Sequence, residues 1–264
     1  MSKKFWVLIL SGILFLSVAI LGVTSVYRVD TVTVEAAIVS EAAREEAQAL
    51  QQELSEAYVK ESMFSVKDNE AKEIIAQFPY FRMVSFKKSY PNRIVIEIAE
   101  DEEVFAVPTA NNDEYYILGL DGVVLGIREN YVNRLDNQEN ILVTGLKASG
   151  TRGEVLKGDA FISPLVAFGK NFSQLLGGIR RNVVSIEIIS ITASMEEALF
   201  RITMREGVRI YISNPSSMME EKSQAAYEKY VSLSAEQRMS GRISIVEMNG
   251  ELIVSYAQKD VFTA

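Results

Sequence analysis

The side chains best suited to catalysis in this sequence are its carboxylates, its serines and its lysines. Two carboxylates at a suitable separation can hydrolyse a glycosidic bond, and a serine beside a lysine can form a nucleophilic dyad. With 35 acids in 264 residues, some carboxylates lie close together by chance, and no local motif marks either arrangement. A membrane-anchored extracytoplasmic glycan-processing enzyme is therefore the alternative, while the residues favour a protein that is not an enzyme.

The sequence contains neither histidine nor cysteine. The usual zinc ligands, imidazole bases and disulfides are thus excluded, and no glycine-rich phosphate loop matches the patterns with known mechanics. We predict no cofactor and no metal, which leaves a binding protein as the leading hypothesis.

A membrane anchor is predicted at residues 5–27, which read FWVLILSGILFLSVAILGVTSVY without a charge. As a helix this run is about 35 Å long, enough for the hydrocarbon core with some tilt. Lys3 and Lys4 favour a cytoplasmic tail at residues 1–4. A cleaved signal peptide is the alternative, but its apolar run is shorter, and Thr24–Arg28 fits a cleavage site poorly.

The part that follows the anchor is strongly acidic. Lys3, Lys4 and Arg28 precede residue 29, so the remainder holds 24 bases against 35 acids, a net charge of −11. Such a surface is expected to repel nucleic acid and anionic lipid head groups, and we predict no nucleic-acid partner.

A compact α+β unit is predicted directly after the anchor. The pattern gives a strand at 29–34, helices at 40–58 and 68–78, and a hairpin in which Val84 and Phe86 alternate before Ile94, Ile96 and Ile98. The apolar stripe of the 40–58 helix fits packing on the sheet better than a partner-helix seam. Lys87, Lys88 and Arg93 crowd the hairpin turn, where they either meet an acidic partner or lipid head groups, or are simply solvated.

The rest of the chain predicts a mostly antiparallel sheet with two helices on one face. Hairpin signals stand at Asp121-Gly122 and Asn249-Gly250, and Gly177-Gly178 ends the first helix. Asn214-Pro215 is expected to open the second helix, because proline suits the first helical position.

The last predicted strand is the candidate binding site. A final strand often lies at a sheet edge, where unpaired N–H and C=O groups can accept an extended segment of another protein. From the residues alone, a strand that merely closes the domain is an equal alternative. The candidate partner-binding residues are Glu251, Leu252, Ile253, Val254, Ser255, Tyr256 and Ala257.

The order of these pieces resembles the bacterial cell-division protein family FtsQ/DivIB. The resemblance is carried by Phe78–Val84, by Tyr90–Ile98 with Glu100, by Tyr115–Leu118 with Asp121–Leu125, and by Lys222–Tyr230 followed by Gly241–Met248. It implies an α+β fold with a single transmembrane helix, a POTRA-like domain at 28–103, a β domain at 104–257 and a C-terminal tail at 258–264.

The resemblance also implies a function. Family members are non-enzymatic divisome scaffolds in the cell membrane at the division septum, with extracytoplasmic C-terminal domains. They bind the coiled-coil membrane proteins FtsB/DivIC and FtsL and thereby organise septal cell-wall synthesis. Strand addition at the C-terminal edge is a major contact in the family, so the resemblance favours docking at 251–257, with Tyr256 as the expected anchor.

Overall fold

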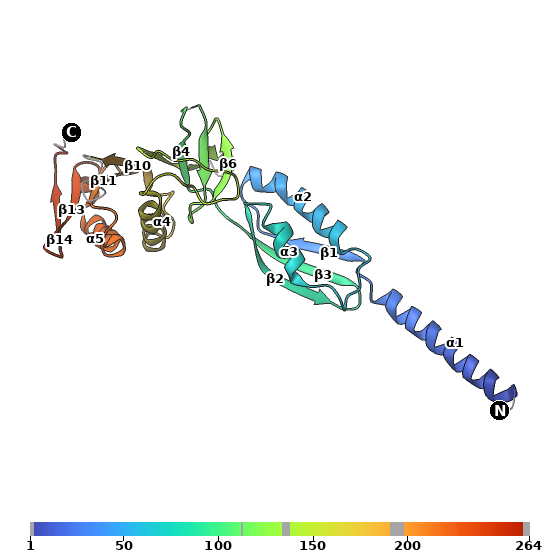
Figure 1. Cartoon of the computed structure of the whole chain (residues 1–264). Helices are drawn as coiled ribbons and strands as arrows, with labels where there is room; N and C mark the ends of the chain where they lie inside the picture. The colour runs from blue at the N-terminus through green and yellow to red at the C-terminus, as the bar shows by residue number, and fades with distance from the viewer. Residues whose placement is uncertain (1–2, 112, 134–137, 191–197, 261–264) are drawn as a thin grey trace. The chain divides into compact units, whose positions relative to one another are not determined.

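The computed structural model describes residues 3–111, 113–133, 138–190 and 198–260 (Figure 1). The chain divides into two compact units that meet between Glu100 and Asp101, three residues before the boundary expected from the sequence. Each unit has its own sheet and its own buried core.

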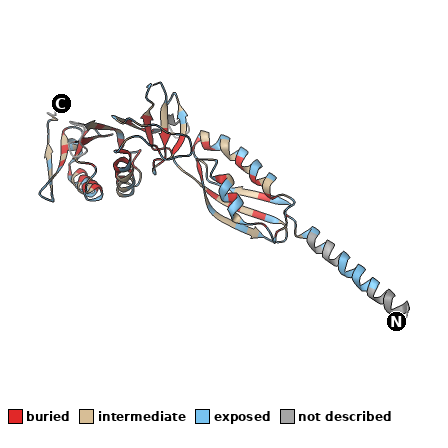
Figure 2. Cartoon of the chain, in the orientation of Figure 1, coloured by how far each residue is buried: buried red, intermediate tan, exposed pale blue. Residues whose placement is uncertain are grey.

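The chain begins with helix α1, Lys3–Val26. The side chains from residue 10 to residue 18 are all exposed, including Leu10, Leu14 and Phe15 at 65%, 68% and 76% (Figure 2). Counting only the residues that the structure describes, no helix combines the length and the apolarity of a membrane span.

The first unit continues with two helices on one side of a three-stranded sheet (Figure 1). The sheet order is β1-β3-β2, with β1 parallel and β2 antiparallel to the central strand. Ala43, Leu50 and Leu54 of α2 are fully buried, so the predicted apolar stripe packs inside this unit. The elements are β1 Thr31–Glu35, α2 Glu41–Tyr58, α3 Asp68–Ile75, β2 Phe81–Ser89 and β3 Arg93–Glu100.

Glu100, the last residue of β3, fixes the start of α2. Its two carboxylate oxygens accept from the backbone N–H groups of Val39 and Ser40, at 2.5 and 3.0 Å. The Ser40 hydroxyl in turn accepts from the Ala43 N–H and caps the helix. Glu100 therefore ties two segments 60 residues apart, which explains a carboxylate at the end of this strand.

The second unit is built on a nine-stranded sheet in the order β14-β13-β12-β11-β10-β9-β4-β5-β6. Five of its eight neighbouring pairs are antiparallel, and β4–β9, β9–β10 and β12–β13 are parallel. The strands are β4 Phe105–Pro108, β5 Tyr115–Leu118, β6 Val124–Arg128, β9 Ile141–Thr144, β10 Val183–Ser190, β11 Ala198–Met204, β12 Arg209–Ser213, β13 Arg242–Met248 and β14 Glu251–Ala257. Two-residue strands β7 Val132–Asn133 and β8 Gln138–Glu139 pair separately.

Helices α4, Ile162–Leu176, and α5, Met219–Ser232, lie on one side of this sheet (Figure 1). Phe168, Phe172 and Ala226 of these helices join Phe200 and Ile245 of the sheet in one buried core. Gly177 ends α4 with a left-handed φ of 65°, as predicted.

The predicted start of α5 at Asn214-Pro215 is wrong. Asn214 and Met218 both have positive φ, 43° and 51°, and the Ser217 N–H donates to the Asn214 carbonyl. These residues therefore form a turn, and the helix begins at Met219. A short helix that the sequence did not predict, α6 Ala235–Arg238, follows α5.

Candidate partner-binding edge

The seven candidate residues, Glu251–Ala257, form strand β14 at one end of the nine-stranded sheet. Within the described part of the chain, β14 pairs only with β13, in a register that runs from Met248 opposite Glu251 to Arg242 opposite Ala257. The strand and its edge position are as predicted, whereas binding of a partner there stays a prediction.

The turn between the two strands decides which main-chain groups face outward. Asn249 and Gly250 have φ of 54° and 80°, as in the two-residue turn that matches the twist of a hairpin. Such a turn closes on a hydrogen-bonded pair, here Met248 and Glu251, and hydrogen-bonded pairs then alternate along the ladder. The N–H and C=O groups of Leu252, Val254 and Tyr256 therefore point away from β13, toward the open edge.

The opposite edge of the sheet, at β6, is partly covered. The Val124 N–H donates to the Glu154 carbonyl at 2.9 Å, and the Gly153 N–H donates to the Val124 carbonyl at 2.8 Å. The Arg152 side chain also donates to the Leu125 carbonyl. The loop after β9 thus occupies main-chain groups at the start of β6, which makes β14 the more accessible edge.

The two faces of β14 differ in character. Val254 and Tyr256 pack against the core on the helix side. On the other face Ile253 is 49% exposed, and its register partner Val246 and nearby Met248 on β13 are 39% and 56% exposed. An added strand would thus find apolar side chains beside it on both faces.

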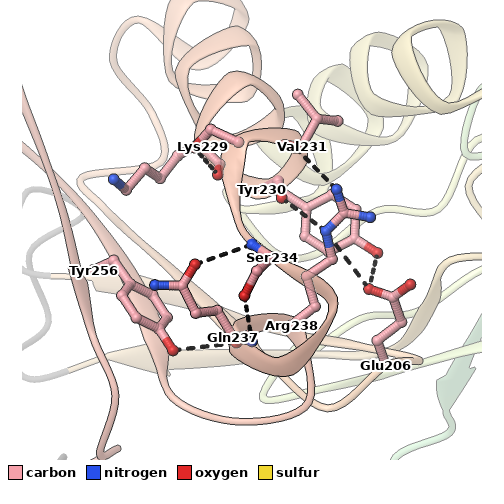
Figure 3. Close-up of polar contacts among 9 residues, drawn as sticks. Glu206, Lys229, Tyr230, Val231, Ser234, Gln237, Arg238 and Tyr256 are labelled. Atoms are coloured by element: carbon pink, nitrogen blue, oxygen red, sulfur yellow. Dashed lines mark hydrogen bonds and ion pairs between the residues drawn. The ribbon is translucent and has the colours of Figure 1, made fainter.

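Tyr256, the expected anchor, is already bonded within the domain (Figure 3). Its hydroxyl donates to the backbone carbonyls of Gln237 and Ser240, 3.2 and 3.4 Å away. These bonds join β14 to the turn that contains α6. Tyr256 therefore has a structural role, and only part of its ring surface remains for a partner.

A polar network holds the α6 turn in place (Figure 3). Ser234 and Gln237 form a capping box, in which each side chain accepts from the other residue's N–H. Arg238 donates to the Tyr230 carbonyl at 3.1 Å and stacks over the Tyr230 ring at 4.9 Å. Burial, with a hydrogen bond to Glu206, raises the pKa of Tyr230 to about 12, so its hydroxyl stays a donor.

A buried lysine ties the hairpin to α5. Lys222 is fully buried, and its ammonium donates to the Glu247 carboxylate at 3.1 Å and to the Asn214 carbonyl at 2.8 Å. The Lys222 hydrogen bond, with a further one from Ser217, lowers the pKa of Glu247. A signal for Lys222 was present in the sequence, since it falls on the face of the predicted helix that carries Met219, Ala226 and Tyr230.

The chain beyond β14 returns across the sheet as far as it is described. The Asp260 carboxylate accepts from the Arg209 guanidinium at 2.6 Å and from the Tyr211 hydroxyl at 2.8 Å. Tyr211 is only 3% exposed, and its pKa is raised by burial and by the hydrogen bond to Asp260. Residues 258–260 of the expected tail are therefore attached to β12, while 261–264 lie outside the described residues.

The geometry gives the glycan-processing alternative no support. Among the described residues, the buried carboxylate is Glu103, which accepts from Arg128 at 2.6 Å and from Asn140 at 3.0 Å. No group of three or more acidic residues in the described part of the chain could hold a metal ion. These contacts are those of a structural ion pair.

Comparison with known proteins gives two matches. Residues 32–101, which span β1 to β3, match the family model described as "POTRA domain, FtsQ-type". A curated relative, "Cell division protein DivIB" of Clostridium acetobutylicum, is 36% identical over 69 residues, which cover 26% of this chain and 27% of the relative. The matched region is thus about a quarter of the relative's length. Residues 32–101 are therefore similar to the FtsQ-type POTRA domain, and a stretch of 69 residues of the chain is similar to a cell division protein.

Proposed function

We propose that this chain is a membrane-anchored scaffold of cell division, not an enzyme, that binds FtsB/DivIC- and FtsL-like membrane proteins outside the cytoplasm. Its place is the division septum, where it organises cell-wall synthesis. The FtsQ-type POTRA domain and the similarity to a cell division protein support this setting.

The anchor in this proposal is residues 5–27. They carry no charge, the helix α1 covers 24 residues, and its apolar side chains from Leu10 to Val18 are exposed rather than packed on the domain. A helix that is apolar on all sides needs an apolar environment. The lysines before it favour a cytoplasmic N-terminus, which puts both folded units on the far side of the membrane.

The observation that carries the proposed binding mode is the open edge of β14. Leu252, Val254 and Tyr256 direct N–H and C=O groups outward, and a partner's extended segment can pair with them as a tenth strand. The apolar side chains of Leu252, Val254 and Ile253 would then provide selectivity. This contact fits the DivIC-like partner, which reaches the same side of the membrane.

Substituting Val254 tests this mode, because its N–H faces the open edge. Val254→Pro removes that donor and leaves the ladder to β13 intact, since edge strands tolerate proline on the outer side. Val254→Thr is the matched control, because it keeps both the donor and the branched side chain. Val254→Pro should weaken binding of the partner about five- to tenfold, because it removes one hydrogen bond and constrains the strand.

The measurement is co-purification, and then titration, of the full-length chain in detergent with the DivIC-like protein. Thermal unfolding of both variants shows whether the domain stays folded. Equal affinity of wild type, Val254→Pro and Val254→Thr would place the binding site elsewhere. The cellular setting is tested separately, by imaging a fluorescent fusion in dividing cells, where uniform membrane signal would contradict a septal role.

A further inference from the structure

Three aromatic rings meet at the end of the first unit where α1 joins it. The Tyr27 ring centroid lies 5.2 Å from that of Phe64 and 6.1 Å from that of Tyr90, and the Phe64 and Tyr90 centroids are 6.4 Å apart. The rings come from three separate segments: the residue after α1, the loop between α2 and α3, and the β2–β3 turn. We call these three residues the aromatic cluster.

Backbone hydrogen bonds make the aromatic cluster part of the folded domain. The Met63 N–H donates to the Tyr27 carbonyl at 2.9 Å, and the Val29 N–H donates to the Glu61 carbonyl at 2.9 Å. The Asp30 N–H donates to the Asn92 carbonyl at 2.8 Å, which brings the β2–β3 turn to the same place. Tyr27 is therefore held by the domain and is not in a loose linker.

The aromatic cluster is unusually exposed for rings in mutual contact. Phe64 is 64% exposed and Tyr90 is 57% exposed, whereas Tyr58, Tyr80 and Phe81 of the same unit are buried. Gathering apolar ring surface at one exposed point is unfavourable in water and indicates a surface that is covered in use. The question is what covers it.

The position along the chain identifies the covering surface. Tyr27 directly follows Val26, the last residue of α1, so under the proposed function it lies where the chain leaves the bilayer. Phe64 and Tyr90 are fixed within ring contact of Tyr27 and must lie at the same level. Aromatic rings are favoured at this level of a membrane, between head groups and acyl chains.

The charged residues around the aromatic cluster also indicate that a membrane surface covers it. Arg28 and Lys60 are exposed at this end of the unit, with the acids Asp30 and Glu61 beside them. Arg93 is exposed as well, but its guanidinium donates to the Thr33 hydroxyl on β1. The Lys88 ammonium also belongs to this end, because it donates to the Met63 carbonyl. Bases thus outnumber acids here, although the chain after residue 28 carries a net charge of −11, and a basic rim complements anionic head groups.

We propose that the aromatic cluster docks the POTRA domain onto an anionic phospholipid surface. The rings of Phe64 and Tyr90 enter the boundary between head groups and acyl chains, and Arg28 and Lys60 contact lipid phosphates. This contact, which rests on the proposed membrane anchor, holds the first unit against the membrane.

The test uses tryptophan fluorescence of the full-length chain in vesicles of phosphatidylglycerol and phosphatidylcholine. Trp6 is the single tryptophan of the chain. Trp6→Phe combined with Phe64→Trp therefore places one probe in the aromatic cluster. Trp6→Phe combined with Val84→Trp is the matched control, because Val84 is 52% exposed and lies six residues, about 20 Å, along the sheet from Tyr90.

Lipids brominated near the head group should quench the probe at position 64 at least twofold more than the probe at position 84. Iodide in the water should do the reverse. A probe at 64 that iodide quenches as strongly as the probe at 84 would overturn the proposal. Protection from iodide without quenching by brominated lipid would also overturn it, and would indicate a protein in place of the membrane.

The unaltered chain separates this inference from the anchor on which it rests. Its Trp6 should be quenched by lipids brominated on their acyl chains. If Trp6 is quenched and the probe at position 64 is not, the anchor stands and the docking surface fails. If neither is quenched, the anchor itself is wrong and the docking inference falls with it.

Discussion

The Tyr256 hydroxyl lies 3.2 Å from the Gln237 carbonyl and joins the edge strand β14 to α6. Tyr256→Phe keeps the ring against the core and removes this bond and the longer one to Ser240. We expect the free energy of unfolding to fall by about 1 kcal/mol, and partner affinity to stay unchanged. Chemical denaturation checks the stability, and titration with the proposed DivIC-like partner checks the affinity.

Tyr256→Ala is the informative counterpart, because it also removes the half-buried ring. Its expected cost is about 2–3 kcal/mol, below that of a fully buried aromatic residue. If Tyr256→Phe weakens binding strongly while stability is retained, the hydroxyl contacts the partner directly and the structural role assigned here is wrong.

Gly241 and Gly250 give a matched pair for testing the packing of the edge strand. Both have positive φ, 90° and 80°, but a Cβ at Gly241 would lie 2.4 Å from the Ala257 carbonyl oxygen, whereas one at Gly250 would meet nothing within 4 Å. Alanine at either position has the conformational cost of about 1 kcal/mol. Gly241→Ala should lower the free energy of unfolding by about 2 kcal/mol more than Gly250→Ala, because the end of β14 must move.

The comparison is read from urea unfolding midpoints of the two variants and the wild type. Amide hydrogen exchange of residues 251–257 adds a local measure, and should rise only in Gly241→Ala. Equal loss of stability in both variants would show that the contact with Ala257 is relieved without disturbing the strand.

The pair of Lys222 and Glu247 predicts a pH dependence of stability. Because the folded-state pKa of Glu247 is lowered by the Lys222 hydrogen bond, its contribution is fully present above the unfolded-state pKa. The contribution is lost as the pH falls below about 4.3, the usual value for glutamate. The melting temperature of Glu247→Gln should therefore be lower than that of wild type at pH 7, and the difference should shrink toward pH 3.

Asp68→Asn provides the control for this titration. Asp68 also has a lowered pKa from a lysine hydrogen bond, but its partner Lys72 is exposed on the surface of α3. Exposed pairs contribute little, so the effect of Asp68→Asn on the melting temperature at pH 7 should be smaller than that of Glu247→Gln. A Glu247→Gln difference that is constant from pH 7 to pH 3 would contradict the ion-pair assignment.

Replacing the single carboxylate of Glu103 should strongly lower the stability of the second unit. It is 1% exposed and accepts from Arg128 and Asn140. Glu103→Ala should lower the free energy of unfolding by about 3 kcal/mol, because it leaves these donors without their acceptor. The neighbouring exposed Glu102 supplies the control, since Glu102→Ala should change stability by less than about 0.5 kcal/mol.

Local patterns predicted most elements of this fold. The Asn249-Gly250 turn and the alternation of residues 251–257 place the last hairpin correctly, because both signals act between neighbours in the sequence. The start of α5 was mispredicted for the opposite reason: positive φ at Asn214 and Met218 is a property of the folded turn. The proline at position 215 gives no indication of this backbone conformation.

The candidate site was predictable as a strand but not in its surroundings. Its edge position follows from the chain order, whereas the parallel pairing of β12 with β13 depends on packing between distant segments. The bonds from Tyr256 to the α6 turn and from Asp260 to β12 join residues 16 to 51 apart in the sequence. Periodicity carries no information on such contacts.

The outward N–H and C=O groups of β14 can pair with one added strand. Two copies of the chain that pair through β14 would form a symmetric dimer, and this dimer would occupy the open edge of both copies. Self-association and capture of a partner would thus be mutually exclusive. The concentration of the protein would then set how much of it is free to bind a partner.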